Sequence, residues 1–461
     1  MFKTLWMLPM LGTLLISPSL YQDGCDSGDD DDTPIEETPR PEMSDYERFL
    51  VYVSDLESTT DTDAREALTD EFFRDIEYSE GFPIQNGASV TFVYEQELGI
   101  NEPLSVAGDF NGWDADAHPL ERIVDGFWVF STTLDFSDPG AYDRYKFVGE
   151  DNGGARIWFA DPAARRFQYD SYGEYSLVAG GDQGDPSHLE RYPAFYSDVM
   201  GNSRDLFLYI PPGYEHETRT YPVLYMHDGQ NLFDPESNYG GWQVDDVIDQ
   251  LLAQGDMDEI LVVGVANTPD RMDEYTHVED FLVGYGLVGG EAPLYADFLV
   301  NEVKPFVDER YRSRLDREET AVLGSSLGGL VSYYIGWAYP DVFGLVGGMS
   351  STLGWGSIGL ENPTMIEIIG ESEPLMDRYY LDSGGDDGGG CVDADGDGIE
   401  DDNPNADDNY CETLQMERTL EELGYGSDDL LYIWAPGAEH NEAAWHARMH
   451  YPLTFWFGTD G

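Results

Sequence analysis

The sequence predicts an α/β fold with a mostly parallel sheet, preceded by a small all-β sandwich. Three observations predict this architecture. Over residues 190–461, β-branched and apolar runs alternate with helical patterns, as in a sheet whose strands are joined by helices. Within that region, residues 320–330 pass from an apolar run through Gly-x-Ser-x-Gly into a helical pattern, which is a strand–turn–helix unit. Residues 84–185 instead contain short β-rich runs separated by Asn, Gly, Asp and Pro turns.

The N-terminus predicts an export signal. Leu5–Ile16 is a mostly apolar run of signal-peptide length, too short to span a membrane. Ser17 and Ser19 suit ordinary cleavage, whereas the Gly-Cys pair ending at Cys25 resembles the end of a bacterial lipoprotein signal. We favour a lipid anchor at Cys25, followed by an acidic linker over residues 26–42, and hence an exported protein that is either held in the cell envelope or secreted.

The rest of the chain divides by composition and periodicity. Residues 43–83 show two short helical patterns, each with an apolar face. The predicted segments are the export signal 1–25, the linker 26–42, the helical segment 43–83, the β sandwich 84–185, and the α/β domain 190–461 with an acidic insertion at 388–411.

The charge balance excludes two classes of partner. Asp and Glu number 92 against 23 Lys and Arg, a formal net charge of −69. Such a chain repels nucleic acid and anionic lipid, so we expect neither as a partner, and membrane contact only through Cys25.

The β-rich segment carries a recognisable motif. Residues 106–113 read Val-Ala-Gly-Asp-Phe-Asn-Gly-Trp, followed later by Gly126-Phe-Trp and Tyr145-Lys-Phe-Val. This segment resembles the immunoglobulin-like early-set sandwich related to glycogen-binding modules. Some members stack sugars on exposed tryptophans, for which Trp113, Trp128 and Trp158 are candidates, but we expect a structural or substrate-positioning role.

The α/β region places chemistry at the carboxyl ends of its strands. Between the strands lie helical patterns at 245–252, 295–311 and 411–423. The predicted strands are 206–210, 223–227, 260–265, 321–324, 345–349, 379–381 and 430–434.

Ser326 is the predicted nucleophile. The turn after the strand is tight, and Gly324 and Gly328 remove side chains that would collide beside the serine. A glycine-rich turn alone would give the same pattern, so the assignment depends on partners further along the chain. These partners should follow in the order acid, then histidine.

The partners are chosen by their place after strands. His440 follows the strand 430–434, and we predict it as the general base in preference to His446 and His450. The acid should follow the strand 379–381, where Asp387 is our first choice and Asp386 the reserve.

An oxyanion requires two backbone N–H donors. One belongs to Leu327, the residue after the nucleophile, and the other is predicted at Gly229, in the loop after strand 223–227.

These motifs bring a family resemblance. Residues 224–233 (Leu-Tyr-Met-His-Asp-Gly-Gln-Asn-Leu-Phe), 271–276, 302–308, 324–329 and 437–442 resemble the enterochelin esterase and feruloyl esterase group of α/β-hydrolases. The resemblance implies a Ser–acid–His esterase, which supports Ser326, Asp387 and His440. It also implies that Arg271 and Tyr275 help to shape the substrate site. The insertion immediately after the predicted acid departs from the family pattern.

The insertion has the spacing of a calcium loop. Asp393, Asp395, Asp397 and Asp401 occupy positions 1, 3, 5 and 9, with Gly at position 6 and the Ile399 carbonyl at position 7. A further carboxylate, from Asp402, Asp407 or Asp408, must complete the shell, because position 12 is Pro404. We predict a structural calcium ion here.

Cys391 and Cys411 bracket this loop, and Cys25 is the other cysteine of the chain. We predict a Cys391–Cys411 disulfide, which agrees with export.

The predicted function is hydrolysis of a carboxylic ester on a small molecule or a glycan, without a catalytic cofactor. Two alternatives stay open. One is an acyltransferase, which the same fold and triad support. The other is a non-catalytic surface carbohydrate-binding protein that uses the Trp113 region.

Overall fold

The computed structural model describes residues 43–136, 143–178, 186–386, 389–400 and 408–459. Residues Ser44–Gly461 form one compact unit. The predictions for the export signal, Cys25, Asp387 and Asp401 lie outside the described residues. Within the ranges just given, no helix is both long enough and apolar enough to cross a bilayer.

The central feature is the sheet of the α/β region, and its strand order matches the predicted mostly parallel plan. Its strands lie in the order β19-β18-β17-β16-β12-β13-β11-β10. Every pair from β19 to β13 is parallel, and β11 is antiparallel to both β13 and β10. The strands are β10 (His188–Ser197), β11 (Asn202–Ile210), β12 (Val223–His227), β13 (Leu261–Val265), β16 (Thr320–Ser325), β17 (Leu345–Met349), β18 (Arg378–Ser383) and β19 (Leu430–Trp434).

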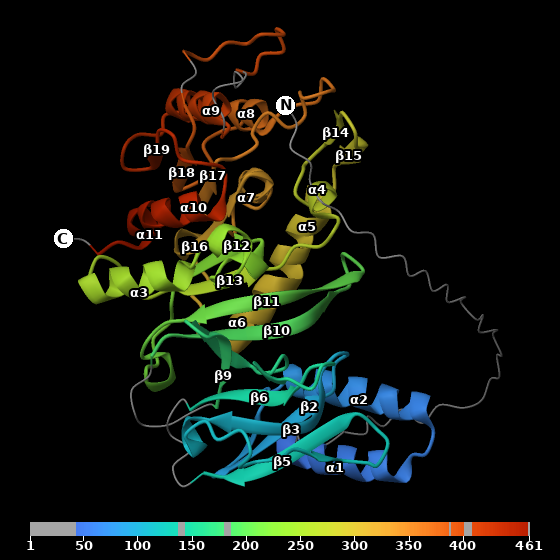
Figure 1. The fold of residues 1–461 in the computed structure, drawn as a ribbon. Helices are drawn as coiled ribbons and strands as arrows, with labels where there is room; N and C mark the ends of the chain where they lie inside the picture. The colour runs from blue at the N-terminus through green and yellow to red at the C-terminus, as the bar shows by residue number, and fades with distance from the viewer. Residues whose placement is uncertain (1–42, 137–142, 179–185, 387–388, 401–407, 460–461) are drawn as a thin grey trace, which may run out of the picture. The chain divides into compact units, whose positions relative to one another are not determined.

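Helices cover both faces of this sheet (Figure 1). Successive side chains of a strand point to opposite faces. In β12, Tyr225 packs into the core with α5, α6, α7, α8 and α9, whereas Leu224 and Met226 pack into the core with α3, α10 and α11. Burial on both faces explains why the strands are continuous apolar runs. The helices are α3 (Val244–Gln254), α5 (Ala292–Phe298), α6 (Lys304–Arg310), α7 (Leu327–Ala338), α8 (Met365–Gly370), α9 (Tyr410–Glu422), α10 (Glu442–Arg448) and α11 (His450–Phe457).

The helical pattern predicted at 295–311 is divided in the structure. A π-helical turn, η5 (Leu299–Val303), separates α5 from α6. Pro305 in the first turn of α6 lacks the N–H that an uninterrupted α-helix requires, which accounts for a local change of hydrogen bonding near this point.

The short helical segment predicted near the N-terminus forms α1 (Asp45–Ser58) and α2 (Thr62–Glu77). A reciprocal capping box between Ser44 and Glu47 starts α1. The ring of Tyr52 stacks on that of Phe72, with centroids 4.1 Å apart, and this contact holds the two helices together.

The predicted β-rich segment consists of antiparallel strands in two sheets. One sheet has the order β1-β2-β5-β4, and the other continues from β10 through β8, β9 and β6 to β3, with β7 paired to β6. Aromatic side chains of both sheets, such as Phe92 and Tyr145 at 4.9 Å, meet between them. The strands are β1 (Ile84–Asn86), β2 (Ser89–Glu95), β3 (Asn101–Gly108), β4 (Glu121–Arg122), β5 (Val129–Asp135), β6 (Arg144–Glu150), β7 (Arg156–Phe159), β8 (Arg166–Asp170) and β9 (Gly173–Leu177).

The tryptophans of this segment differ in exposure. Trp158 is 41% exposed and its ring centroid lies 6.2 Å from that of Trp113. Trp128 is half-buried against Phe127 and belongs to the core with α1 and α2. Trp113 is half-buried like Trp128, so Trp158 is the most exposed of the three.

Candidate active site

Ser326 lies on a strained turn between β16 and α7. Its backbone has φ 56° and ψ −122°, a conformation that costs a non-glycine residue free energy and is typical of a nucleophile elbow. Its N–H donates to the Met349 carbonyl at 2.9 Å, and its Oγ lies 3.4 Å from Thr352 Oγ1. The loop after β17 thus supports the elbow.

The two glycines of the elbow differ in how much space a side chain would have. A Cβ at Gly324 would lie 2.5 Å from the Gly328 carbonyl carbon, so a side chain there would collide with the backbone of α7. A Cβ at Gly328 would come no closer than 3.4 Å, to Asp228 Oδ2. The predicted collision holds at Gly324, while Gly328 has room for a methyl group.

His440 has a carboxylate partner, which is Asp408. The His440 Nδ1 atom and Asp408 Oδ1 are 2.6 Å apart, and the Asp408 side chain is fully buried. Asp408 Oδ2 accepts hydrogen bonds from the Ser350 hydroxyl at 2.6 Å and from the Gly384 N–H. This buried carboxylate therefore has three polar partners, an arrangement that fits the acid of a triad.

The acid that contacts His440 thus comes from the far end of the insertion. Asp387 lies outside the described residues, and Asp386 is exposed. Asp408 lies just before α9 rather than just after β18, so the insertion separates it from β18 in the sequence. The sequence offers one signal for this position: the aspartates at 407 and 408 directly precede the helical pattern that begins near Cys411.

The loop after β12 lies against the elbow. Gly229 is buried, and a Cβ there would lie 2.7 Å from the Gly264 carbonyl carbon of β13, so only glycine fits. Leu327 is the first residue of α7. These are the residues that we predicted as oxyanion donors, and both lie at the carboxyl ends of neighbouring strands, β12 and β16.

Asp228, which precedes Gly229, forms hydrogen bonds with three neighbouring side chains. Its carboxylate pairs with Arg271 through Nε at 2.7 Å and Nη2 at 2.8 Å, and it accepts from Asn267 Nδ2 at 2.6 Å. The Asp228 N–H donates to the Tyr275 hydroxyl at 3.3 Å. Asp228 also has a positive φ of 58°, so this ring of contacts holds a strained residue.

The two residues expected to shape the substrate site therefore differ. Arg271 keeps 28% of its side chain exposed, so part of the guanidinium remains accessible. Tyr275 is fully buried, and its hydroxyl supports the Asp228 loop from beneath. Burial also lowers the pKa of the adjacent His227 to about 3, so this histidine is neutral at physiological pH.

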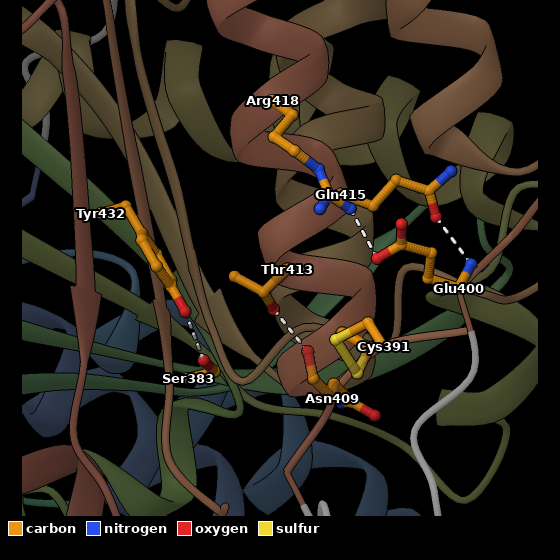
Figure 2. The surroundings of a disulfide bond; sticks show 9 residues. Ser383, Cys391, Glu400, Asn409, Thr413, Gln415, Arg418 and Tyr432 are labelled. Atoms are coloured by element: carbon orange, nitrogen blue, oxygen red, sulfur yellow. Dashed lines mark hydrogen bonds and ion pairs between the residues drawn. A yellow bond between two sulfur atoms is a disulfide. The ribbon is translucent and has the colours of Figure 1, made fainter. Parts of the chain in front are cut away.

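The insertion is fastened to α9. The Cys391–Cys411 disulfide is present, as predicted, with Cys411 fully buried. Figure 2 shows the neighbouring contacts, in which the Glu400 N–H donates to Gln415 and its carboxylate pairs with Arg418. The Asp408 segment is therefore anchored on a covalently closed loop.

The predicted calcium ligands are partly described. One carboxylate oxygen from each of Asp393, Asp395 and Asp397 lies within 4.8 Å of the others, on exposed residues. The same carboxylates accept from backbone N–H groups of the loop, as Asp393 Oδ1 does from Gly396 at 2.6 Å. Ile399 is buried, which anchors the loop.

Comparison with known proteins places the chain in a family. A family model described as "Putative esterase" matches residues 197–451, more than half of the chain. The chain belongs to this esterase family. It is a carboxylic ester hydrolase, in agreement with the resemblance drawn from its motifs.

Individual relatives are distant. "Uncharacterized protein YbbA" of Bacillus subtilis (strain 168) is 24% identical over 250 residues, which cover 53% of this esterase and 89% of that protein. The "Endo-1,4-beta-xylanase/feruloyl esterase" of Xylanibacter ruminicola is 24% identical over 237 residues, covering 49% of this chain and 28% of that protein. Among solved structures, enterochelin esterase from Shigella flexneri has a TM-score of 0.44 at 16% identity, covering 80% of this chain and 92% of that chain.

The elbow geometry yields a prediction about stability. Gly324→Ala should lower the free energy of unfolding by about 3 kcal/mol, because its methyl group overlaps the α7 backbone. Gly328→Ala is the matched control, and we expect a change below about 1 kcal/mol, since its contacts are ordinary and alanine favours helix. Urea unfolding of both variants measures the difference, and equal stabilities would contradict the steric explanation.

Proposed function

We propose that this esterase is a serine hydrolase with the triad Ser326, His440 and Asp408, and that it acts on esters of the enterochelin or feruloyl type. The observation that carries the proposal is the 2.6 Å contact between His440 Nδ1 and the buried Asp408 carboxylate. Asp408 takes the acid role that we predicted for Asp387. The strained Ser326 turn, after β16, supplies the nucleophile.

The proposed mechanism assigns the proton of the neutral His440 ring to Nδ1. Asp408 accepts the Nδ1 proton, so the neutral imidazole has its lone pair on Nε2. Nε2 takes the Ser326 proton as Oγ attacks the ester carbonyl, and it returns that proton to the leaving alcohol. A water molecule then loses a proton to Nε2 and attacks the acyl carbonyl. The acyl–Oγ bond breaks, Nε2 returns the proton to Ser326 Oγ, and the acid leaves.

The backbone N–H groups of Gly229 and Leu327 are the proposed donors to the oxyanion. They belong to buried residues at the ends of rigid strands, so they need little reorganisation when charge develops. The Asp228–Arg271 pair fixes the first of these loops.

Arg271 is the proposed contact for the substrate. It is bound to Asp228 through Nε and Nη2 and remains 28% exposed, so it offers a positioned cation beside the elbow. A guanidinium suits the oxygen-rich aromatic groups of catecholate or hydroxycinnamate esters. The relative whose name includes feruloyl esterase supports the same substrate class.

We also propose that calcium binds the loop of Asp393, Asp395, Asp397 and the Ile399 carbonyl, with Asp401 and a further carboxylate completing the shell. Oxygen ligands in this spacing suit Ca²⁺. The ion would neutralise charge in a segment that leads directly to Asp408. The export signal and the Cys25 anchor stay proposals of the same kind, based on the N-terminal sequence.

Replacing the nucleophile tests the proposed function. Ser326→Ala should abolish hydrolysis of a nitrophenyl ester and of feruloyl esters, because no other group can form the acyl-enzyme. Ser325→Ala, one residue earlier on β16, is the control and should keep turnover. Unchanged turnover in Ser326→Ala would end the proposal.

Replacing the acid tests which aspartate serves the triad. Asp408→Asn should lower kcat by about 10⁴-fold, because an amide favours the wrong tautomer of His440. Asp386→Asn and Asp387→Asn are the matched controls and should stay near the wild-type rate. A large loss in Asp387→Asn with an active Asp408→Asn would restore our first choice.

Calcium removal tests the insertion. Adding a chelator should lower the melting temperature by several degrees, because the ion stabilises the folded state that binds it. Asp393→Asn should remove this response, whereas Asp125→Asn, on an exposed turn away from the loop, should retain it. Chelation that leaves both the melting temperature and the activity unchanged would contradict calcium binding.

A further inference from the structure

Ser350 contacts the proposed acid from the neighbouring strand. It is the first residue after β17, it is fully buried, and its φ of 48° is unusual for a residue other than glycine. Its hydroxyl lies 2.6 Å from Asp408 Oδ2. A strained, buried serine beside a catalytic carboxylate calls for a physical explanation.

The direction of the Ser350 hydrogen bond is determined by its neighbours. Trp445 Nε1 donates to Ser350 Oγ at 3.0 Å, and Arg448 Nη2 donates to it at 3.1 Å. An indole and a guanidinium can only donate, and a hydroxyl has two lone pairs and one proton. Both lone pairs are therefore in use, and the single proton is directed to Asp408.

Arg448 is itself held in place. Its Nε and Nη2 bind the two oxygens of Asp382 at 3.1 Å each, and both side chains are buried. Asp382 lies on β18 and also accepts from the Tyr380 hydroxyl at 2.8 Å. A buried cation between Asp382 and Asp408 offsets the charge of two carboxylates in a dry region.

The backbone of Ser350 also forms hydrogen bonds, one of them to the residue that follows Asp408. Its carbonyl accepts from Asn409 Nδ2 at 2.7 Å, and its N–H donates to the Asp382 carbonyl at 2.9 Å. Asp408 and Asn409 both have positive φ, 97° and 56°, so this turn needs support from outside. Ser350 thus holds the carboxylate of one residue and the amide of the next.

We propose that Ser350 is the positioning residue for the triad acid: its hydroxyl, oriented by Trp445 and Arg448, fixes Asp408 Oδ2 so that Oδ1 faces His440. The inference rests on the proposed Ser326–His440–Asp408 mechanism. Ser350 does not touch the substrate; it acts through Asp408. Ser350, at the end of β17, thereby positions an acid that lies at the far end of the insertion in the sequence.

A double-mutant cycle tests this role. Ser350→Ala should lower kcat by about 10- to 100-fold with KM changed less than about threefold, the loss expected for a hydrogen bond to a charged group. In an Asp408→Asn background the same change should cost less than about threefold, because the acid it positions is already disabled. An equal loss in both backgrounds would show a merely structural role and overturn the proposal.

Two further measurements keep the test decisive. Ser351→Ala removes the next hydroxyl along the chain, at equal burial, and should leave kcat unchanged. The downfield NMR resonance of the His440 Nδ1 proton should persist in Ser351→Ala and weaken or disappear in Ser350→Ala. If Ser350→Ala does not fold, Ser350→Cys, which keeps a weak donor of similar shape, should show an intermediate kcat.

The failure of this inference can be told from failure of the proposed function. If Ser326→Ala is inactive and Ser350→Ala has the wild-type kcat, the role of Ser350 is wrong and the triad stands. If Ser326→Ala retains turnover, both fall together.

Discussion

The proposed active site depends on one constraint, which is the burial of the Asp408 carboxylate. A buried charge without partners would cost several kcal/mol, so every donor around it contributes to the fold as well as to the site. Its partners come from three places in the chain: the end of β17, the turn after β18, and the loop after β19. The parallel sheet is what brings those three places together, because all three strands end at the same edge.

Strain accumulates at that edge. Asp228, Ser326 and Ser350 follow the neighbouring strands β12, β16 and β17, and each is a non-glycine residue with positive φ. Each is held by tertiary contacts: Asp228 by Arg271, Ser326 by the loop after β17, and Ser350 by the acid and its neighbours. Each sharp turn places its side chain at a strand end, and the packed sheet beneath offsets the cost.

The acidic insertion connects β18 to the residue that contacts His440. In the sequence, the insertion follows Asp387, our first choice for the acid. In the structure, Asp408, which contacts His440, lies at the far end of the insertion. The disulfide and the contacts of Glu400 with Gln415 and Arg418 tie the loop to α9, the helix that begins beside the acid. We therefore expect these ties between the loop and α9 to affect how firmly Asp408 holds His440.

The sequence by itself determined the strands, the sharp turn at Ser326 and the disulfide, and it placed His440 after a strand. Those features depend on local patterns: apolar runs, a glycine spacing, a histidine after a strand, and two cysteines around a loop. Only the tertiary structure decided that Asp408 meets His440 and that Ser350 and Arg448 surround it. Hydrogen bonds between residues 32 and 58 positions apart leave no local pattern, and in a loop rich in aspartate the composition cannot show which carboxylate is buried.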